Sequence, residues 1–201
     1  MEDLVMVPRS AVRFPLELRT PVGFRAEDAS TWPDVPGRME WVGGRLWLMP
    51  PCGEVQASVA TDATLVVAGW ARDRADFVVG SSEAGMKLGD DVRGAECGVW
   101  RLDLATAPSS GFARRPPILA VEVTGQDEGE DTLRPKAAWY LAHGVLVVWI
   151  VLCDAQEVLV VTPEGERRFA RGEQLPEHPA LPGLTPGVDR FFVDLNRRLG
   201  R

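Results

Sequence analysis

Apolar and polar residues follow two different periods along the first part of the chain, and each period predicts its own kind of element. The segments 38–42 and 45–49 flank Gly43-Gly44, a two-residue signal typical of a tight turn, and are expected to form a β-hairpin. Residues 53 to about 74 then place apolar side chains at helical spacing, with polar residues between them. A hairpin followed by a long amphipathic helix is therefore expected.

The middle of the chain predicts further strands and then a strand, a helix and a second strand. Gly and Asp residues separate the expected short strands, which cover 77–79, 85–88 and 96–101, with a turn over 90–94. An apolar strand is expected over 118–123 and another over 146–151. Between them, the helix is predicted to start with Thr132 as N-cap and Pro135 in the first turn, and to stop at Gly144.

The end of the chain predicts one more hairpin, over 158–161 and 167–169, and a tail over 181–201 that is a loop with a short terminal helix. A length of 201 residues suits one domain with a sizeable core, 1–201, which begins with an irregular arm over about 1–35. The order of elements predicts an α/β fold in which helices flank a mixed sheet that carries an N-terminal β-hairpin.

Composition and charge limit the kinds of function. A formal net charge of −7 and a pI near 5.0 argue against a protein that coats nucleic acid through its bulk charge, although a local arginine patch could still contact phosphate. The chain has no apolar run of membrane-spanning length, and charged residues interrupt the segment 1–19, so neither a membrane span nor a signal peptide is expected. A cytoplasmic location follows. Cys52, Cys97 and Cys153 form no paired motif and are expected to be reduced core thiols.

Glu122 is the residue that most clearly indicates chemistry, because it lies inside the apolar strand 118–123. Burying an ionised carboxylate is costly unless a cation or strong hydrogen-bond donors meet it. Lys136, on the helix that follows, is one of only two lysines in a chain whose other basic residues are arginine. Tyr140, the sole tyrosine, and His143 share its helix face. Glu122 and Lys136 are expected to belong to one site.

A second carboxylate, Glu96, is expected at the start of the strand 96–101. Two carboxylates at the ends of neighbouring strands could share a hard divalent ion, Mg²⁺ or Mn²⁺, which prefers oxygen ligands. Such an ion activates water for attack and neutralises charge on a phosphodiester. Lys136 would orient the water or stabilise the developing negative charge. Glu54, in the first turn of the long helix, is a candidate outer ligand.

Each of these residues also has an interpretation without function. Glu96 alone fits a surface carboxylate at a strand end, and Lys136 alone fits a solvated residue of the first helical turn. Glu122 could face water if its strand lay at an edge of the sheet. Tyr140 suits packing as well as a site, and His143 is assigned first to capping the helix C-terminus. The residues themselves leave these alternatives open.

Taken in order, these signals resemble the Uma-two family of putative restriction endonucleases, within the PD-(D/E)xK nuclease superfamily. The segments that carry the resemblance are 39–46, Met49-Pro50-Pro51, 85–88, 121–123 with Lys136, Tyr140, Gly144 and Trp149, and 181–184. The resemblance implies a restriction-endonuclease-like α/β core, a divalent metal and hydrolysis of DNA phosphodiester bonds. It would also suit a homodimer, since cutting two strands is simplest with two symmetric sites.

By this resemblance, the Pro-Asp motif of the family falls on Ala95-Glu96, its Glu-x-Val motif starts at Glu122, and its helix lysine falls on Lys136. Glu96 and Glu122 would bind the metal, the Val123 carbonyl would add a ligand, and Lys136 would assist the attacking water. Two departures matter. Glu96 in place of Asp lengthens the metal-binding arm by one methylene, and Thr124-Gly125 replaces the usual Ser-Pro.

We therefore expect a Mg²⁺-dependent endonuclease that hydrolyses DNA. The competing hypothesis is a binding or assembly module of the same fold whose site has decayed, which Ala95-Glu96 and the acidic charge favour. A metal-dependent hydrolase of a smaller phosphoester is the third hypothesis. Only an enzyme should lose activity on removal of one carboxylate while keeping its fold.

Overall fold

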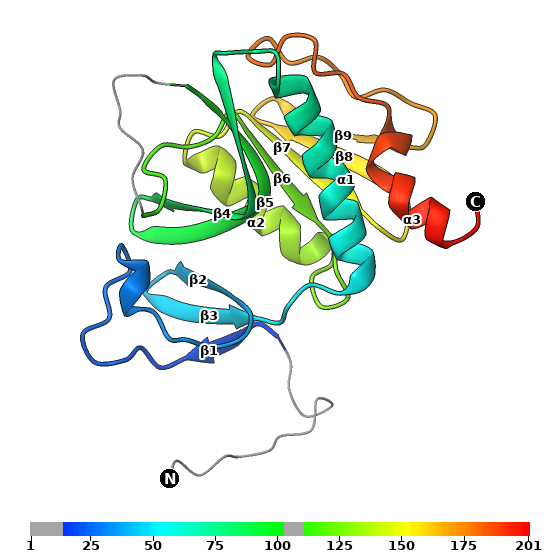
Figure 1. Cartoon of the computed structure of the whole chain (residues 1–201). Coiled ribbons are helices and arrows are strands. Elements are labelled where there is room, and N and C mark those ends of the chain that lie inside the picture. Colours follow the sequence, from blue (N-terminus) through cyan, green and yellow to red (C-terminus); the bar gives the residue numbers. More distant parts are fainter. Residues whose placement is uncertain (1–13, 103–110) are drawn as a thin grey trace.

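A mixed β-sheet between helices is the frame of the chain in the computed structural model, which describes residues 14–102 and 111–201 (Figure 1). Among these residues, strands pair in the order β1-β3-β2-β5-β6-β7-β8-β9, and β4 pairs with β5 beside this path. The strands are β1 Leu16–Leu18, β2 Arg38–Val42, β3 Arg45–Met49, β4 Phe77–Leu88, β5 Asp91–Arg101, β6 Leu119–Val123, β7 Val147–Leu152, β8 Glu157–Thr162 and β9 Gly165–Phe169. The helices are α1 Glu54–Ala71, α2 Glu130–Ala142 and α3 Val193–Arg198, with 3-10 turns η2 Ala29–Thr31 and η3 Val188–Phe192.

The β2–β3 hairpin confirms the first sequence prediction. Gly43 and Gly44 have φ angles of 59° and 76°, the positive pair that a type I′ turn requires. The hairpin joins the rest of the sheet where Trp41 of β2 pairs with Val92 of β5. At its other side β3 pairs with β1, so the N-terminal arm is not wholly irregular. The first thirteen residues of that arm lie outside the described residues.

The β4–β5 hairpin corrects the expected turn over 90–94. Leu88 pairs directly with Asp91, so only Gly89, with a φ of 59°, and Asp90 connect the two strands. The short strands expected over 77–79 and 85–88 are one long strand. Asp and Gly residues suggested a longer turn, but long cross-strand pairing overrides their local preference. As a result Glu96 lies inside β5 rather than at its start.

The segment from β6 to β7 confirms the expected strand, helix and strand, because β6 and β7 are parallel and α2 connects them. The helix start is different from the prediction. Gly129 is the N-cap, Thr132 is already helical, and Pro135 lies inside the helix. Glu130 and Asp131 in the first turn face the positive end of the helix dipole, which explains the earlier start.

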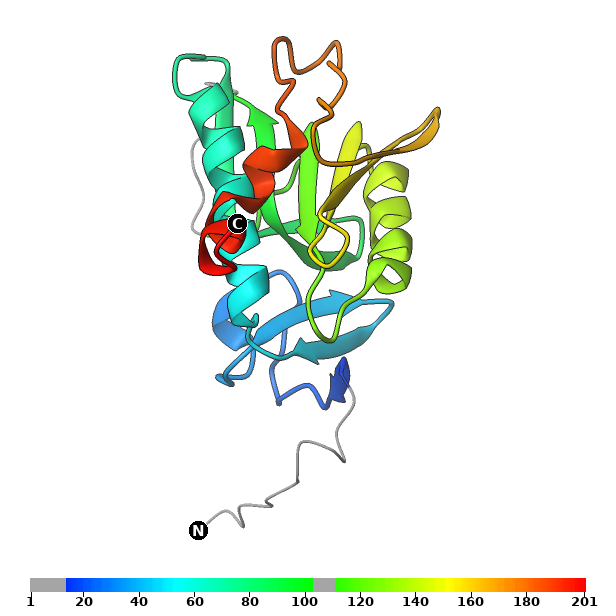
Figure 2. The ribbon, with the colours of Figure 1, turned by 90° about the vertical axis from the view of Figure 1, so that its right-hand side faces the viewer.

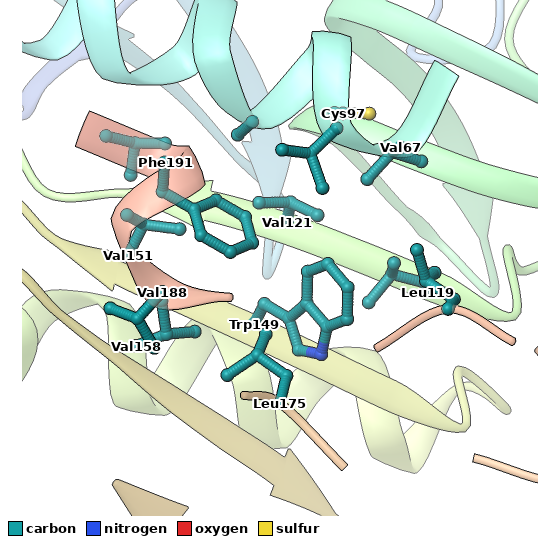
Figure 3. Close-up of a cluster of buried hydrophobic side chains, with 14 of the residues drawn as sticks. Val67, Cys97, Leu119, Val121, Trp149, Val151, Val158, Leu175, Val188 and Phe191 are labelled. Atoms are coloured by element: carbon teal, nitrogen blue, oxygen red, sulfur yellow. The ribbon is translucent and has the colours of Figure 1, made fainter. Parts of the chain in front are cut away.

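Helices cover both faces of the sheet: α1 packs on one face with η3 and α3, and α2 packs on the other (Figure 2). A large apolar cluster fills the space under α1; Val121, Trp149 and Phe191 meet there (Figure 3). A second cluster lies under α2 and includes Ala120 and Tyr140. Successive side chains of a strand point to opposite faces, so Ala120 and Glu122 of β6 face α2 while Val121 faces α1.

The last part of the chain follows the prediction, with a β8–β9 hairpin and a short terminal helix, α3. Gly144, with a φ of 92°, ends α2 as expected, and His143 is its C-cap, with Nδ1 2.8 Å from the Trp139 carbonyl oxygen. Cys97 and Cys153 are buried free thiols, but Cys52 is exposed and is not a core residue. None of the described helices is long and apolar enough to cross a bilayer.

Candidate active site

Glu122 is buried on the α2 face of the sheet with only 2% of its surface exposed. Its strand, β6, lies between β5 and β7, so the alternative of a water-facing edge carboxylate is wrong. Two donors from α2 meet the carboxylate. The Lys136 Nζ lies 3.0 Å away, and the Tyr140 hydroxyl donates to Oε1 at 2.7 Å. The helix thus supplies both the cation and the neutral donor that a buried carboxylate needs.

Lys136 is buried to a similar degree, with 4% of its surface exposed, so it is not a solvated residue. Because α2 begins at Glu130, Lys136 lies in its second turn and points to the sheet rather than sitting at the helix start. Its Nζ is also 3.0 Å from Oε1 of Glu40, on β2. One ammonium therefore bridges two buried carboxylates from different strands.

Glu40 is one of the site residues that the sequence analysis missed. It is 4% exposed, and it accepts hydrogen bonds from the Arg93 guanidinium at 2.8 Å and from the Gly94 backbone N–H at 3.3 Å. Burial by itself would raise the pKa of Glu40, but the Coulomb attraction of Lys136 and Arg93 outweighs it and lowers the pKa. The signal available in the sequence was a carboxylate between Met39 and Trp41 in a predicted strand.

Tyr140 takes part in this network and is not only a packing residue. Its hydroxyl donates to Glu122 and also lies 2.9 Å from the Gly94 carbonyl oxygen. Burial raises the pKa of Tyr140 well above its usual value, and the neighbouring charge of Glu122 raises it further. The hydroxyl therefore stays protonated and acts as a donor.

Glu96 of β5 lies next to Glu122 of β6. The two antiparallel strands pair Cys97 with Val121, and Glu96 and Glu122 are the adjacent residues on each strand. Glu96 is 8% exposed, so it is not a surface carboxylate. A register shift between Ser81 and Ala84 of β4 lies opposite it. Bulges of this kind bend a strand and redirect its side chains. Glu96 accepts a hydrogen bond from Gln56 of α1, whereas Glu122 accepts hydrogen bonds from Lys136 and Tyr140 of α2.

The partners of Glu96 come from α1 and β2. Gln56 Nε2 donates to Glu96 Oε1 at 3.1 Å, and an Arg38 guanidinium nitrogen lies 3.4 Å from the same oxygen. Arg38 also pairs with Glu128, in the loop before α2. The wall of a pocket of about 570 Å³ between α1 and β4 includes Arg38, Thr61 and Glu96. Glu96 can therefore be reached from solvent through this pocket.

Gln56 connects Glu96 to the end of β6. Its Nε2 lies 3.2 Å from the Val123 carbonyl oxygen, and only 5% of the residue is exposed. A Cβ on Gly125 would collide with Gln56 Oε1, so the side chain fits only because residue 125 is glycine. On its other side Gln56 lines a second pocket, of about 650 Å³, together with Thr124 and Cys153.

One further candidate, the proposed outer ligand Glu54, is not part of the site. Glu54 is exposed at the start of α1 and pairs with Arg198, so it does not reach the buried carboxylates.

The comparisons with known proteins agree with this architecture. The family model of Uma2, described as "Putative restriction endonuclease", matches residues 26–194. The chain belongs to the Uma2 family. Its structure is similar to a crystal structure described as a putative nuclease belonging to DUF820 from Anabaena variabilis ATCC 29413, with a TM-score of 0.68 and 16% sequence identity over 79% of this chain and 93% of that chain. A comparison with curated proteins finds no match.

Membership of the Uma2 family confirms the resemblance drawn from the sequence, and the structural likeness confirms the fold class of a mixed α/β sheet of the nuclease type. The described residues contain no group of three or more His, Cys, Asp and Glu side chains arranged to hold a metal ion. A cation at this Uma2 site would need carbonyl or amide oxygens and water beside the carboxylates, which suits Mg²⁺. Glu96 and the Val123 carbonyl fit this requirement, because both oxygens already converge on one electropositive NH₂ group.

Proposed function

We propose that the protein is a Mg²⁺- or Mn²⁺-dependent endonuclease that hydrolyses DNA phosphodiester bonds, with Glu96 and Glu122 as metal ligands and Lys136 as the residue that assists the attacking water. The observation that carries the proposal is the charged pair of Glu122 and Lys136 buried in the sheet beside Glu96. A buried ion pair gives little net stability compared with apolar residues of the same volume. Function is then the better reason for its presence, and the Uma2 family supports a nuclease.

The side chains divide the work between positioning and binding. A bound divalent ion would supply charge neutralisation at the phosphate and activation of water. Glu40 and Glu122 hold the Lys136 ammonium in place from two sides. Arg38, beside Glu96 on the pocket wall, is placed to contact a phosphate oxygen of an entering strand. Because the chain is acidic, contacts to DNA would depend on such local arginines, and cutting both strands would suit a homodimer.

One observation favours the second candidate, a module of the same fold whose site has decayed. On the α2 side the two carboxylates of Glu40 and Glu122 are already met by the two cations of Lys136 and Arg93. That half of the network is neutral without a metal ion. A module of this kind would bind DNA or protein without needing a divalent cation.

The test measures Mg²⁺ and Mn²⁺ binding by calorimetry and plasmid nicking in the same samples. The variants are Glu122→Gln and Glu96→Gln, and the matched control is Glu54→Gln, an exposed glutamate of α1 outside the site. Circular dichroism and urea unfolding confirm that each variant folds. We expect wild type and the control to bind metal and nick plasmid, and both site variants to bind metal more weakly and to lose nicking.

Three results would contradict the proposal. Well-folded wild type that binds neither metal overturns it. Binding that keeps wild-type affinity in both site variants places the metal elsewhere. Metal-dependent hydrolysis of bis(4-nitrophenyl) phosphate without plasmid nicking identifies a hydrolase of smaller phosphoesters instead.

A further inference from the structure

The carboxamide of Gln56 occupies the point where oxygens of two candidate metal ligands converge. One nitrogen, Nε2, donates to Glu96 Oε1 at 3.1 Å and to the Val123 carbonyl oxygen at 3.2 Å. We propose that Gln56 is a further metal ligand whose amide group turns over on metal binding, so that Oε1 replaces Nε2 between these two oxygens. The inference rests on the proposed function and adds a residue to its metal site.

The present orientation of the amide is the one expected without a cation. A primary amide offers two N–H donors on one side and an acceptor oxygen on the other. With Nε2 inward, both donors meet oxygens, one charged and one carbonyl. With Oε1 inward and no cation, three oxygens would face each other without a hydrogen between them, which is unfavourable.

The Gln56 carboxamide can rotate because its oxygen, Oε1, points away from Glu96 and Val123. Among the described residues, no hydrogen bond holds Oε1, and the side chain forms part of the wall of the 650 Å³ pocket. Gly125 lies against this oxygen, and any larger residue there would collide with it. A half-turn about the last side-chain bond exchanges the amide oxygen and nitrogen while the rest of the side chain keeps its place. The turn therefore breaks only the two hydrogen bonds made by Nε2.

After the turn, a carboxylate oxygen, a main-chain carbonyl oxygen and an amide oxygen would point to one place. This is the ligand chemistry that hard divalent cations prefer, with water filling the remaining positions. It also compensates for the small number of acidic ligands, because residues 14–102 and 111–201 contain no group of three or more acidic, His or Cys side chains arranged to hold a metal ion. Gln56 supplies an oxygen without adding another buried negative charge.

The competing explanation is that Gln56 only ties α1 to β5 and β6. Gln56→Glu and Gln56→Met separate the two roles when Mn²⁺ affinity and urea stability are both measured. If the Gln56 amide turns over to bind the metal, Gln56→Glu should bind Mn²⁺ about tenfold more tightly, because ligand charge sets the affinity of such sites. Without metal, the same variant should be less stable than wild type. Gln56→Met should bind Mn²⁺ about tenfold more weakly. Gln126→Glu adds the same charge at an exposed position of the same pocket and is the matched control.

A measurement on the wild-type protein avoids any dependence on how the variants fold. The side-chain NH₂ signals of Gln56, assigned by their loss in Gln56→Glu, are followed by NMR during titration with Mg²⁺. Both protons should begin as slowly exchanging hydrogen-bonded protons and should lose that protection as Mg²⁺ binds. A signal pair that stays protected at saturating Mg²⁺ overturns the inference.

The outcomes distinguish this inference from the function on which it rests. If wild type binds Mn²⁺ and both Gln56 variants bind it with wild-type affinity, Gln56 is a structural tie and the endonuclease proposal stands. If Gln126→Glu tightens binding as much as Gln56→Glu, the effect is general electrostatics and the inference fails. If wild type binds no metal, the proposed function fails and the role of Gln56 with it.

Discussion

Replacing Lys136 by methionine should destabilise the protein strongly, because its ammonium neutralises two carboxylates that are out of contact with water. The Nζ lies 3.0 Å from Glu40 and 3.0 Å from Glu122. After the substitution Glu40 keeps the Arg93 guanidinium, and Glu122 keeps the hydroxyl of Tyr140. Removing one partner of a buried ion pair typically costs about 3–5 kcal/mol. Because both carboxylates retain a donor, we expect a loss near the lower end, about 3 kcal/mol at neutral pH.

The pH dependence of this loss identifies its cause. The attraction of Lys136 lowers the pKa of Glu40, so without Lys136 the effect of burial should raise that pKa above the unfolded glutamate value near 4.5. A group with a raised folded pKa binds protons more tightly in the native state, so its penalty grows as pH rises and disappears as pH falls. Urea unfolding at about pH 7.5 and about pH 5.5 should therefore show a smaller loss at the lower pH.

Two variants make the experiment specific. Lys87→Met removes the other lysine, whose Nζ donates to the Gly89 carbonyl oxygen at an exposed turn, and should change stability by less than about 0.5 kcal/mol. Adding Glu40→Gln to Lys136→Met should recover part of the loss, since one of the unneutralised charges is gone. A loss below about 1 kcal/mol for Lys136→Met, or one that is the same at both pH values, would refute the assignment of Lys136 as the counter-charge of these carboxylates.

Two other substitutions test the network and the C-terminal packing. Tyr140→Phe removes the hydroxyl that reaches Glu122 and the Gly94 carbonyl, and urea unfolding should show a loss of about 1–3 kcal/mol; an unchanged midpoint would contradict the bond. Asp62 of α1 accepts from the Asp194 backbone N–H at 2.8 Å, and burial raises the pKa of its carboxyl above 3.8. The contribution of Asp62 to folding stability is therefore fully present below pH 3.8 and is lost as pH rises through the folded pKa. Asp62→Asn should make the fall in melting temperature above about pH 4 less steep. An unaltered slope would contradict the raised pKa of Asp62.

Most of the fold follows from local signals in the sequence. The β2–β3 turn depends on Gly43-Gly44 alone, and the α1 prediction depends on a helical period that runs almost without interruption. Predictions were wrong where a local signal was overridden, by nearby acidic residues at the start of α2 and by long strand pairing between β4 and β5. Pro135 suggested a first helical turn, yet α2 had already begun. Asp91 and Gly94 suggested a turn, yet both pair with β4.

The site residues also divide into those that the sequence predicted and those that it missed. Glu122 and Lys136 could be predicted because each is unusual where it stands: a carboxylate in an apolar strand and a lysine in an arginine-rich chain. Glu40 and Gln56 were missed, since each lies in an element of ordinary polar and apolar pattern, and a single carboxylate between Met39 and Trp41 is a weak signal. Their importance appears only when β2 and α1 are brought against β5 and β6. Burial of a polar residue by a distant element leaves no period in the sequence.

The charges on the two faces of the sheet suggest how stability and metal binding are divided. On the α2 face, Glu122 belongs to a network in which every carboxylate already has a cation. On the α1 side, the amide of Gln56 donates to Glu96 and to the Val123 carbonyl oxygen, and Arg38 pairs with Glu96 and Glu128. A divalent ion at Glu96 would take the place of these amide hydrogens, whereas at Glu122 it would compete with the hydrogen bonds from Lys136 and Tyr140. Glu96→Gln should accordingly weaken Mn²⁺ binding more than Glu122→Gln does, and calorimetry that ranks the two variants in the opposite order would show that the metal is held mainly from the α2 face.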